Sequence, residues 1–333
     1  MKKFLFTSDL HLKNWNDKSY TDEGLPLKLQ EILNVVEDMC EYAKENEIEN
    51  IIIAGDINDT KGTVNVRSFL RLQNLLMKYT EINFFIIPGN HDYTGKGSND
   101  FAVELLKGPE NVHVITKKLE MKNITFLPWR SEGLKEEIRE CSENRILISH
   151  FGLNEASLSN GISLRSGITT KDLKKFELVL LGHYHMPQQV ENVWYAGSPI
   201  PLRRDEINEE KRFLLVSSED DELVVESIPS KGYRQFFQFV IDEDTDIEKL
   251  KKEIEKAKED GHHVIIKSNL KNIPTDISSI KDTQLIDEYE EEFIARGINS
   301  TMKIDEQMVK YLEIEEIKDS EEYIKIGLEV INK

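Results

Sequence analysis

Five short apolar runs in this chain each lead into side chains of the kinds that bind metal ions. These side chains are Asp9 and His11, Asp56 and Asp59, Asn90, His91 and Asp92, His150, and finally His183 and His185. Short apolar runs are typical of buried parallel strands. Ligands of open α/β sheets bind at the carboxyl ends of such strands. We therefore expect these side chains to meet at one edge of one sheet.

The residue types at these positions restrict the metal. Asp, Asn and His without cysteine suit a pair of hard or borderline divalent ions. Such a pair needs a bridging carboxylate, and Asp56 is the best candidate because the glycine before it permits close backbone approach. Asp9 and His11 are two residues apart and are expected to face the same side of an extended segment. His183 and His185 share this spacing.

This donor set predicts phosphoester hydrolysis. Two ions about 3.5–4 Å apart can activate water and hold a phosphoryl group for in-line attack. The leaving oxygen then needs a proton, and His91 is expected to point away from Asn90 and to act as general acid or to stabilise charge. Asp59 or Asp92 could orient its imidazole, as carboxylates commonly do. Each motif alone could be a cap or a turn, but five buried polar clusters without partners would each cost about 1–3 kcal/mol.

The net charge of −19 argues against a chain that coats nucleic acid by bulk charge. A nucleic-acid substrate would need a local basic path, metal ions or a basic partner. The basic residues expected to border the site are Lys13, Lys61, Lys96, Arg130 and Arg165. Arg203 and Arg204 either bind phosphate or only pair with the acidic residues that follow them.

A length of 333 residues predicts two domains. Helical spacing of apolar residues over 29–43 and 66–76 alternates with the apolar runs, which indicates βαβ units. Beyond residue 190, three runs at 192–200, 212–218 and 222–229 are expected to be consecutive strands of a second sheet. A domain boundary is predicted near Pro229–Gly232.

A small β-α-β unit is predicted over about 235–270. Its helix would begin at a capping box formed by Thr245 and Glu248 and would end at Gly261. Residues 280–333 are acidic and are predicted to be helical, with Ile304, Met308, Tyr311 and Leu312 at helical spacing. That face could dock on a partner's coiled coil or pack on its own domain.

The two cysteines, Cys40 and Cys141, give no reason to expect a disulfide, and Cys40 is predicted to be a core residue. A reducing cytoplasm is the simplest location. We expect neither a signal peptide nor a membrane span.

Together the motifs resemble those of the calcineurin-like metallophosphoesterases. They are Asp9-x-His11, Gly55-Asp56, Gly89-Asn90-His91-Asp92, His150 and Gly182-His183-x-His185. The resemblance implies a two-sheet α/β sandwich flanked by helices. It implies that one ion is held by Asp9, His11, Asp56 and His185, and the other by Asp56, Asn90, His150 and His183. His91 would be catalytic.

The segments TSDLHLK, AGDINDT, PGNHDY and YAGSPIPLRRDE more narrowly resemble SbcD-type nuclease subunits. Leu10, Lys13 and Asn58 depart from the usual pattern of that family. The resemblance implies a nuclease domain over 1–230, the start of a small α+β capping domain over 231–275, and the rest of the cap with a possible partner-binding segment over 276–333. It also implies DNA cleavage with two Mn²⁺ ions, an SbcC-type SMC-like coiled-coil ATPase as partner, and a homodimer with contacts near 63–79, in the cytoplasm of a bacterium or a phage-infected host.

Two alternatives stay open. The first is a metallophosphoesterase for small or protein phosphoesters with no role on DNA, which the acidic net charge would suit. The second is a scaffold that has lost its metal, although the sequence lacks none of the expected ligands.

Overall fold

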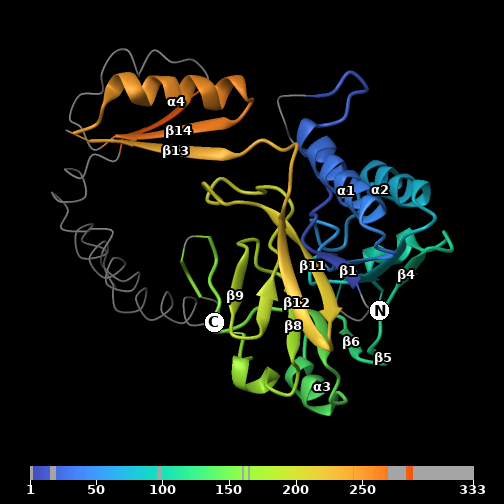
Figure 1. Ribbon diagram of the computed structural model, residues 1–333. Coiled ribbons are helices and arrows are strands. Elements are labelled where there is room, and N and C mark those ends of the chain that lie inside the picture. Colours follow the sequence, from blue (N-terminus) through green and yellow to red (C-terminus); the bar gives the residue numbers. More distant parts are fainter. Residues whose placement is uncertain are drawn as a thin grey trace, which may run out of the picture. The chain divides into compact units, whose positions relative to one another are not determined.

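The computed structural model describes residues 3–15, 20–95, 100–159, 161–163, 166–242, 244–268 and 283–287. Contacts divide the chain into two compact units, which meet in the sequence between Phe236 and Phe237. The helices and strands of the first unit (Figure 1) are β1 Lys3–Thr7, α1 Leu27–Glu45, β2 Asn50–Ala54, α2 Val66–Lys78, β3 Asn83–Ile87, η1 Ala102–Leu106, β4 Val112–Val114, β5 Leu119–Met121, β6 Ile124–Leu127, α3 Leu134–Glu140, β7 Ile146–His150, η2 Thr170–Leu173, β8 Leu178–Gly182, β9 Gln188–Val190, β10 Val193–Tyr195, β11 Arg212–Glu219 and β12 Glu222–Pro229. Both helices expected from apolar spacing, α1 and α2, are present.

Two six-stranded mixed sheets form the first unit. The first sheet has the order β12-β11-β1-β2-β3-β4, and the second has the order β5-β6-β7-β8-β10-β9. The strands that precede the site are parallel within each sheet: β1, β2 and β3 in the first, and β7 and β8 in the second. Their carboxyl ends therefore point the same way within each sheet.

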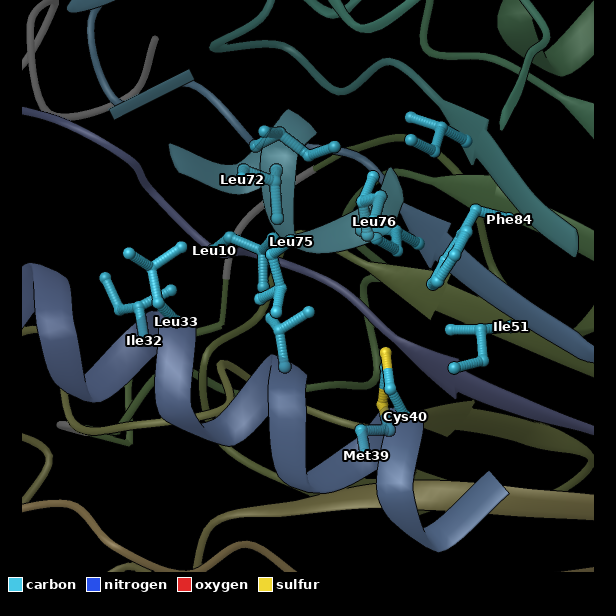
Figure 2. Packing of buried hydrophobic residues seen from close by; sticks show 14 of the residues in the cluster. Leu10, Ile32, Leu33, Met39, Cys40, Ile51, Leu72, Leu75, Leu76 and Phe84 are labelled. Carbon is cyan, nitrogen blue, oxygen red and sulfur yellow. The ribbon is translucent and has the colours of Figure 1, made fainter. Parts of the chain in front are cut away.

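The alternation of side chains along the strands explains the layered core. Leu5 points to the cluster that α1 and α2 cover, whereas Phe4 and Phe6 point to the cluster shared with the second sheet. Figure 2 shows the outer layer, in which Ile32 and Cys40 of α1 face apolar side chains of α2 and of the sheet. Both faces of the first sheet are thus buried. The second sheet packs one face against the first sheet, and α3 and η2 cover the opposite face of the second sheet.

The structure corrects two expectations about the sheets. The predicted ligands come from both sheets, not from one, because β7 and β8 do not pair with β1, β2 or β3. The late strands are also divided: β10 joins the second sheet, while β11 pairs antiparallel with β1 and carries β12 on its outer side. The two-sheet sandwich implied by the family resemblance is the fold observed.

The second unit contains the predicted β-α-β element. It consists of β13 Phe236–Ile241, α4 Ile247–Glu259 and β14 His263–Ser268, and β14 pairs in parallel with β15 Thr283–Asp287. The side chain of Asp246, not Thr245, caps α4 by accepting from the backbone N–H of Lys249 at 3.1 Å. β15 is a strand within the stretch predicted to be helical, and Ile304, Met308, Tyr311 and Leu312 lie outside the described residues.

Cys40 is fully buried in the core, and both cysteines are free thiols. Across the described parts of the chain, we find no helix with an apolar stretch of membrane-spanning length.

Candidate metal centre

The predicted ligands gather where strands of the two sheets end. Asp9 and His11 follow β1, Asp56 follows β2, Asn90 and His91 follow β3, His150 is the last residue of β7, and His183 and His185 follow β8. Their donor atoms form two groups, each with atoms within 4.8 Å of one another: Asp9, His11 and His185 in one, and Asp56, His150 and His183 in the other. Segments far apart in the sequence therefore meet at one place.

The first group presents two imidazole lone pairs to one point. Nδ1 of His185 lies 2.9 Å from the carboxylate of Glu206, and Nδ1 of His11 lies 3.4 Å from that of Asp59. Because a carboxylate accepts, each Nδ1 carries the proton and each Nε2 is left with a lone pair. The two Nε2 atoms face each other at 3.1 Å. In these tautomers neither neutral ring can donate to the other, so both Nε2 lone pairs are available to a shared cation.

The second group gathers oxygen and nitrogen acceptors in the same way. Nδ1 of His150 donates to the carbonyl of Ala54 at 2.8 Å, so Nε2 is the ring nitrogen that faces the other members of the group. That Nε2 lies 3.2 Å from Oδ1 of Asn90 and 3.2 Å from Oδ2 of Asp56. Nδ1 of His183 lies 2.9 Å from the same Asn90 oxygen. An amide oxygen, a carboxylate and two imidazoles thus converge on one place.

Asp56 lies between the two groups. Its Oδ2 is 3.2 Å from Nε2 of His150 and 3.8 Å from Nε2 of His11. Two ligands of one ion with bonds of about 2.1 Å are about 3 Å apart when they are adjacent. The spacings of 3.2 Å between Asp56 and His150 and 3.1 Å between His11 and His185 match this value, whereas the spacing of 3.8 Å between Asp56 and His11 is longer. The residues present therefore fit two neighbouring divalent ions, and Asp56 is the carboxylate that approaches both groups.

The backbone at four of the predicted ligands is strained. Asp9, His11, Asp56 and His183 have φ angles of 58°, 48°, 51° and 105°. Non-glycine residues in this region cost about 1–3 kcal/mol each and cluster at functional sites. The expectation that Asp9 and His11 lie on an extended segment is therefore wrong. They converge through two left-handed residues, held because their N–H groups donate to the carbonyls of Gly55 and Asp56 at 3.0 and 2.9 Å.

Close packing around the loops requires glycine at position 89. A Cβ there would overlap the carboxylate and backbone nitrogen of Asp56 and would lie 2.8 Å from the ring of His150. Gly89 therefore lets the loop after β3 pass directly beside Asp56.

His91 is fixed at the edge of the two groups. Its Nδ1 lies 2.5 Å from the carbonyl oxygen of Asp59, and its N–H donates to Oδ1 of Asp56 at 2.8 Å. The carbonyl only accepts, so Nδ1 is protonated and Nε2 is the atom left for a substrate. The ring lies edge-on to that of His11, with 5.0 Å between centroids.

Asp59 and Asp92, whose carboxylates were expected to orient the His91 ring, make other contacts in the structure. The group that contacts the His91 ring is the backbone carbonyl of Asp59, whereas the Asp59 carboxylate binds His11 and, at 3.0 Å, Nζ of Lys13. Asp92 is buried and accepts backbone N–H groups of Gly89 and Asn58 at 2.8 Å each. Asp92 thus links the loops after β2 and β3.

Burial and charge adjust the pKa values within the centre. Burial and the adjacent His150 lower the pKa of His183 to about 4, so its imidazole is neutral near pH 7 and able to bind metal. Burial opposes ionisation of Asp59, but hydrogen bonds from His11 and Lys13 outweigh it and lower its pKa to about 2. Burial and the nearby Asp56 charge raise the pKa of Asp92.

Glu206 is a site residue that the sequence reasoning missed. It is only 1% exposed, and besides His185 it accepts from Nζ of Lys211 at 2.7 Å, from Oγ of Ser198 at 3.2 Å and from the N–H of Leu202 at 3.0 Å. Nζ of Lys211, fully buried, also donates to the carbonyl of His185 at 3.0 Å. The predicted pairing of Arg203 with Asp205 occurs at 3.3 Å. The only available signal for Glu206 was its place in the GSPIPLRRDE segment.

The predicted basic residues behave differently from one another. Lys13 binds Asp59 and lies 3.9 Å above the ring of Trp15, so it is held by the protein itself. Lys61 lies 5.9 Å from the centre of the Trp129 ring, and Arg130 follows that tryptophan. Lys96 and Arg165 lie outside the described residues.

The two-sheet sandwich with paired acidic and imidazole clusters at its strand ends defines a metal-dependent phosphoesterase. Residues 2–208 match the calcineurin-like phosphoesterase family, and the chain belongs to that family of hydrolases. Exonuclease subunit 1 of Enterobacteria phage T4 is 25% identical over 334 residues, which cover 91% of this chain and 96% of the relative.

Two solved structures are also similar to the chain. A dimetal phosphatase from Danio rerio is 10% identical, with 69% of this chain and 96% of that chain covered and a TM-score of 0.42. The nuclease MPE of Pseudomonas putida is 12% identical, with 73% and 81% covered and a TM-score of 0.30.

Proposed function

We propose that this chain is the nuclease subunit of an SbcD-type complex, a Mn²⁺-dependent DNA exonuclease and endonuclease that hydrolyses phosphodiester bonds. One observation carries the choice of DNA over other phosphoesters. The similarity to the phage exonuclease subunit covers 91% of this chain, whereas the family match ends at residue 208. The likeness therefore extends into the second unit, which a general phosphoesterase does not need.

Seven residues are proposed as metal ligands. They are Asp9, His11, Asp56 and His185 for one ion, and Asp56, Asn90, His150 and His183 for the other. Two such ions supply an activated nucleophile and charge compensation for a phosphoryl group. Mn²⁺ suits this mixture of carboxylate, amide and imidazole donors without thiolate.

His91 is proposed to act on the substrate and not on the metal. Its Nδ1 proton is held by the Asp59 carbonyl, so Nε2 can donate to the leaving oxygen only when the ring is doubly protonated. The Asp59 carboxylate positions His11 and thereby the metal site, while Asp92 fixes the loop that carries His91. Both carboxylates therefore act on catalysis through other residues.

The second unit is proposed to be a DNA-capping domain, with residues 276–333 completing it and contacting a coiled-coil ATPase of the SbcC type. A homodimer is proposed through α2. Val66, Leu70 and Met77 of this helix are 65%, 51% and 50% exposed, and their spacings of four and seven residues place them on one face. An exposed apolar helix face of this kind is typical of an interface.

The experiment that tests the function compares substrates. The full-length protein with Mn²⁺, alone and with its cognate ATPase, is given linear duplex DNA, single-stranded DNA, a cyclic dinucleotide and bis-p-nitrophenyl phosphate. We expect cleavage of DNA. Hydrolysis of the small diesters without any cleavage of DNA would instead support the alternative, a phosphoesterase with no DNA role.

His91→Ala separates catalysis from metal binding in the same assay. We expect cleavage to be lost while the metal content stays near that of the unmodified chain, because the hydrogen bond from His91 to Asp56 is made by its backbone N–H, which the variant keeps. Loss of bound metal in this variant would make His91 a ligand and would refute its proposed role.

A further inference from the structure

A pocket of about 280 Å³ opens beside the loop that carries His91. Tyr93, Phe101, Trp129, Lys117 and Arg130 contribute to its walls. None of these residues has a part in the proposed metal centre. The pocket therefore needs an explanation of its own.

Three aromatic rings form its apolar part. The centroid of Tyr93 lies 6.0 Å from that of Phe101 and 5.6 Å from that of Trp129. Phe101 is buried, while Tyr93 and Trp129 are half-buried and pack against the core under the first sheet. Because the core holds these rings in place, a flat ligand can stack on them with little loss of side-chain entropy.

The charged side chains of the described pocket lining are basic, in contrast to the chain as a whole. The described lining contains Lys117 and Arg130 and no acidic side chain. Nζ of Lys61 lies 5.9 Å from the Trp129 ring centre. Arg130 is fixed by Glu137 at 3.3 Å and by the Trp129 carbonyl at 3.0 Å. Aromatic faces with fixed cations nearby are the combination that binds single-stranded nucleic acid.

The backbone places this pocket next to the reaction site. Tyr93 directly follows Asp92 in the loop after β3, and the N–H of Trp129 donates to the carbonyl of Pro88 at 3.2 Å. The loop that carries Asn90 and His91 therefore leads directly from the metal centre to the aromatic rings. Tyr93 is two residues after His91, so the rings are attached to the same loop as the residue proposed to meet the scissile phosphodiester.

We propose that this pocket binds an unpaired nucleobase of the strand being cleaved, stacked on Tyr93 and Trp129, with Lys117 and Arg130 binding the adjacent phosphate. The inference rests on the proposed nuclease function and extends it, because it assigns specificity for a frayed or single-stranded end. Removal of a stacking ring is expected to weaken binding about 5- to 150-fold, which corresponds to about 1–3 kcal/mol per stacked base.

The test uses two ligands that differ only in the base. Binding of deoxyadenosine monophosphate and of deoxyribose 5-phosphate to the full-length metal-loaded protein is measured by calorimetry. We expect the nucleotide to bind at least fivefold more tightly. Trp129→Leu should remove that difference and Trp129→Phe should keep most of it. Trp194→Leu is the matched control and should leave the difference unchanged. Trp194 is a half-buried tryptophan in β10, and Arg212 lies 5.7 Å from the centre of its ring.

The outcomes separate this inference from the function on which it rests. Equal affinities for the two ligands, or a preference that survives Trp129→Leu, would refute the nucleobase site even if the protein cleaves DNA. A Trp129-dependent preference for the nucleotide would support the site. If the same protein cleaves no DNA, the nuclease proposal fails while the nucleotide site stands. Thermal melting of each variant identifies any that is not folded.

Discussion

Glu206 offers a direct test of how the protein sets one metal site. In Glu206→Gln the amide must place its NH₂ either toward Nδ1 of His185 or toward Lys211, Ser198 and Leu202. The latter three all donate to Oε2 of Glu206, so the amide oxygen is expected to stay with them. The NH₂ then faces His185 and forces its Nδ1 to accept. The imidazole proton moves to Nε2, the atom that faces the metal site.

The expected loss follows from this change of tautomer. Altering the group that orients a histidine ligand typically costs 10- to 100-fold in metal affinity, or about 1.4–2.7 kcal/mol. The loss should be confined to the ion held by Asp9, His11 and His185, because Glu206 contacts no ligand of the other group. Mn²⁺ titration followed by electron paramagnetic resonance and calorimetry would show one weakened site and one unchanged site.

Glu209→Gln is the matched control for this experiment. Glu209 also accepts from Nζ of Lys211 at 2.7 Å, but the imidazole of His185 is bound by Glu206. The Glu209→Gln variant should have a slightly lower free energy of unfolding and unchanged affinities for both Mn²⁺ ions. If Glu206→Gln keeps both affinities within twofold, or if Glu209→Gln weakens metal binding equally, the tautomer argument is wrong.

Three further predictions concern packing, charge and assembly. Gly89→Ala should abolish binding of at least one metal ion, since its Cβ overlaps Asp56; metal analysis of the folded variant checks this, and two retained ions would contradict it. Burial lowers the pKa of Lys28 from 10.5 to about 8, so the unfolded chain binds more protons between these pH values and stability should rise with pH there, by at most about 1.4 kcal/mol per pH unit. Urea unfolding of Lys28→Met at pH 7, 8.5 and 10 should lack this rise, and parallel curves for the two proteins would refute it. Leu70→Glu should shift a dimer to monomer in sedimentation while leaving the melting temperature within a few degrees, because Leu70 is exposed; an unchanged dimer would exclude this face of α2.

Local patterns were sufficient to predict α1, α2 and the strands that precede the proposed ligands. The 3.6-residue period of Leu29 to Ala43 located α1, and the short apolar runs located the strands before the ligands. The order of strands could not be obtained in this way. The run 193–195 and the run 212–219 are both apolar, yet one joins β8 and the other joins β1. Strand pairing depends on where a chain turns between runs, and periodicity carries no information about that.

The groups that hold the ligands were predicted least well. The sequence suggested that a carboxylate of Asp59 or Asp92 holds His91, but a backbone carbonyl makes this contact, and every residue has one. Asn58, which departs from the family pattern, is buried and donates through its side chain to the carbonyls of Thr60 and Thr63 at 2.5 and 3.1 Å. Such contacts depend on the path of two loops at once. Local sequence patterns therefore cannot predict them.

The origin of the ligands in two sheets has a consequence for how the site is maintained. Asp9 follows a strand of the first sheet, and its carboxylate accepts the N–H of His183, which follows a strand of the second, at 3.1 and 3.2 Å. Asp56 and His150 are a second such pair. A shift of one sheet against the other would separate both pairs. The apolar layer between the sheets, which contains Phe6, is therefore part of what keeps the two halves of the metal centre in register. The positive φ angles of Asp9, His11, Asp56 and His183 are then stable because both sheets oppose relaxation of the loops that carry them.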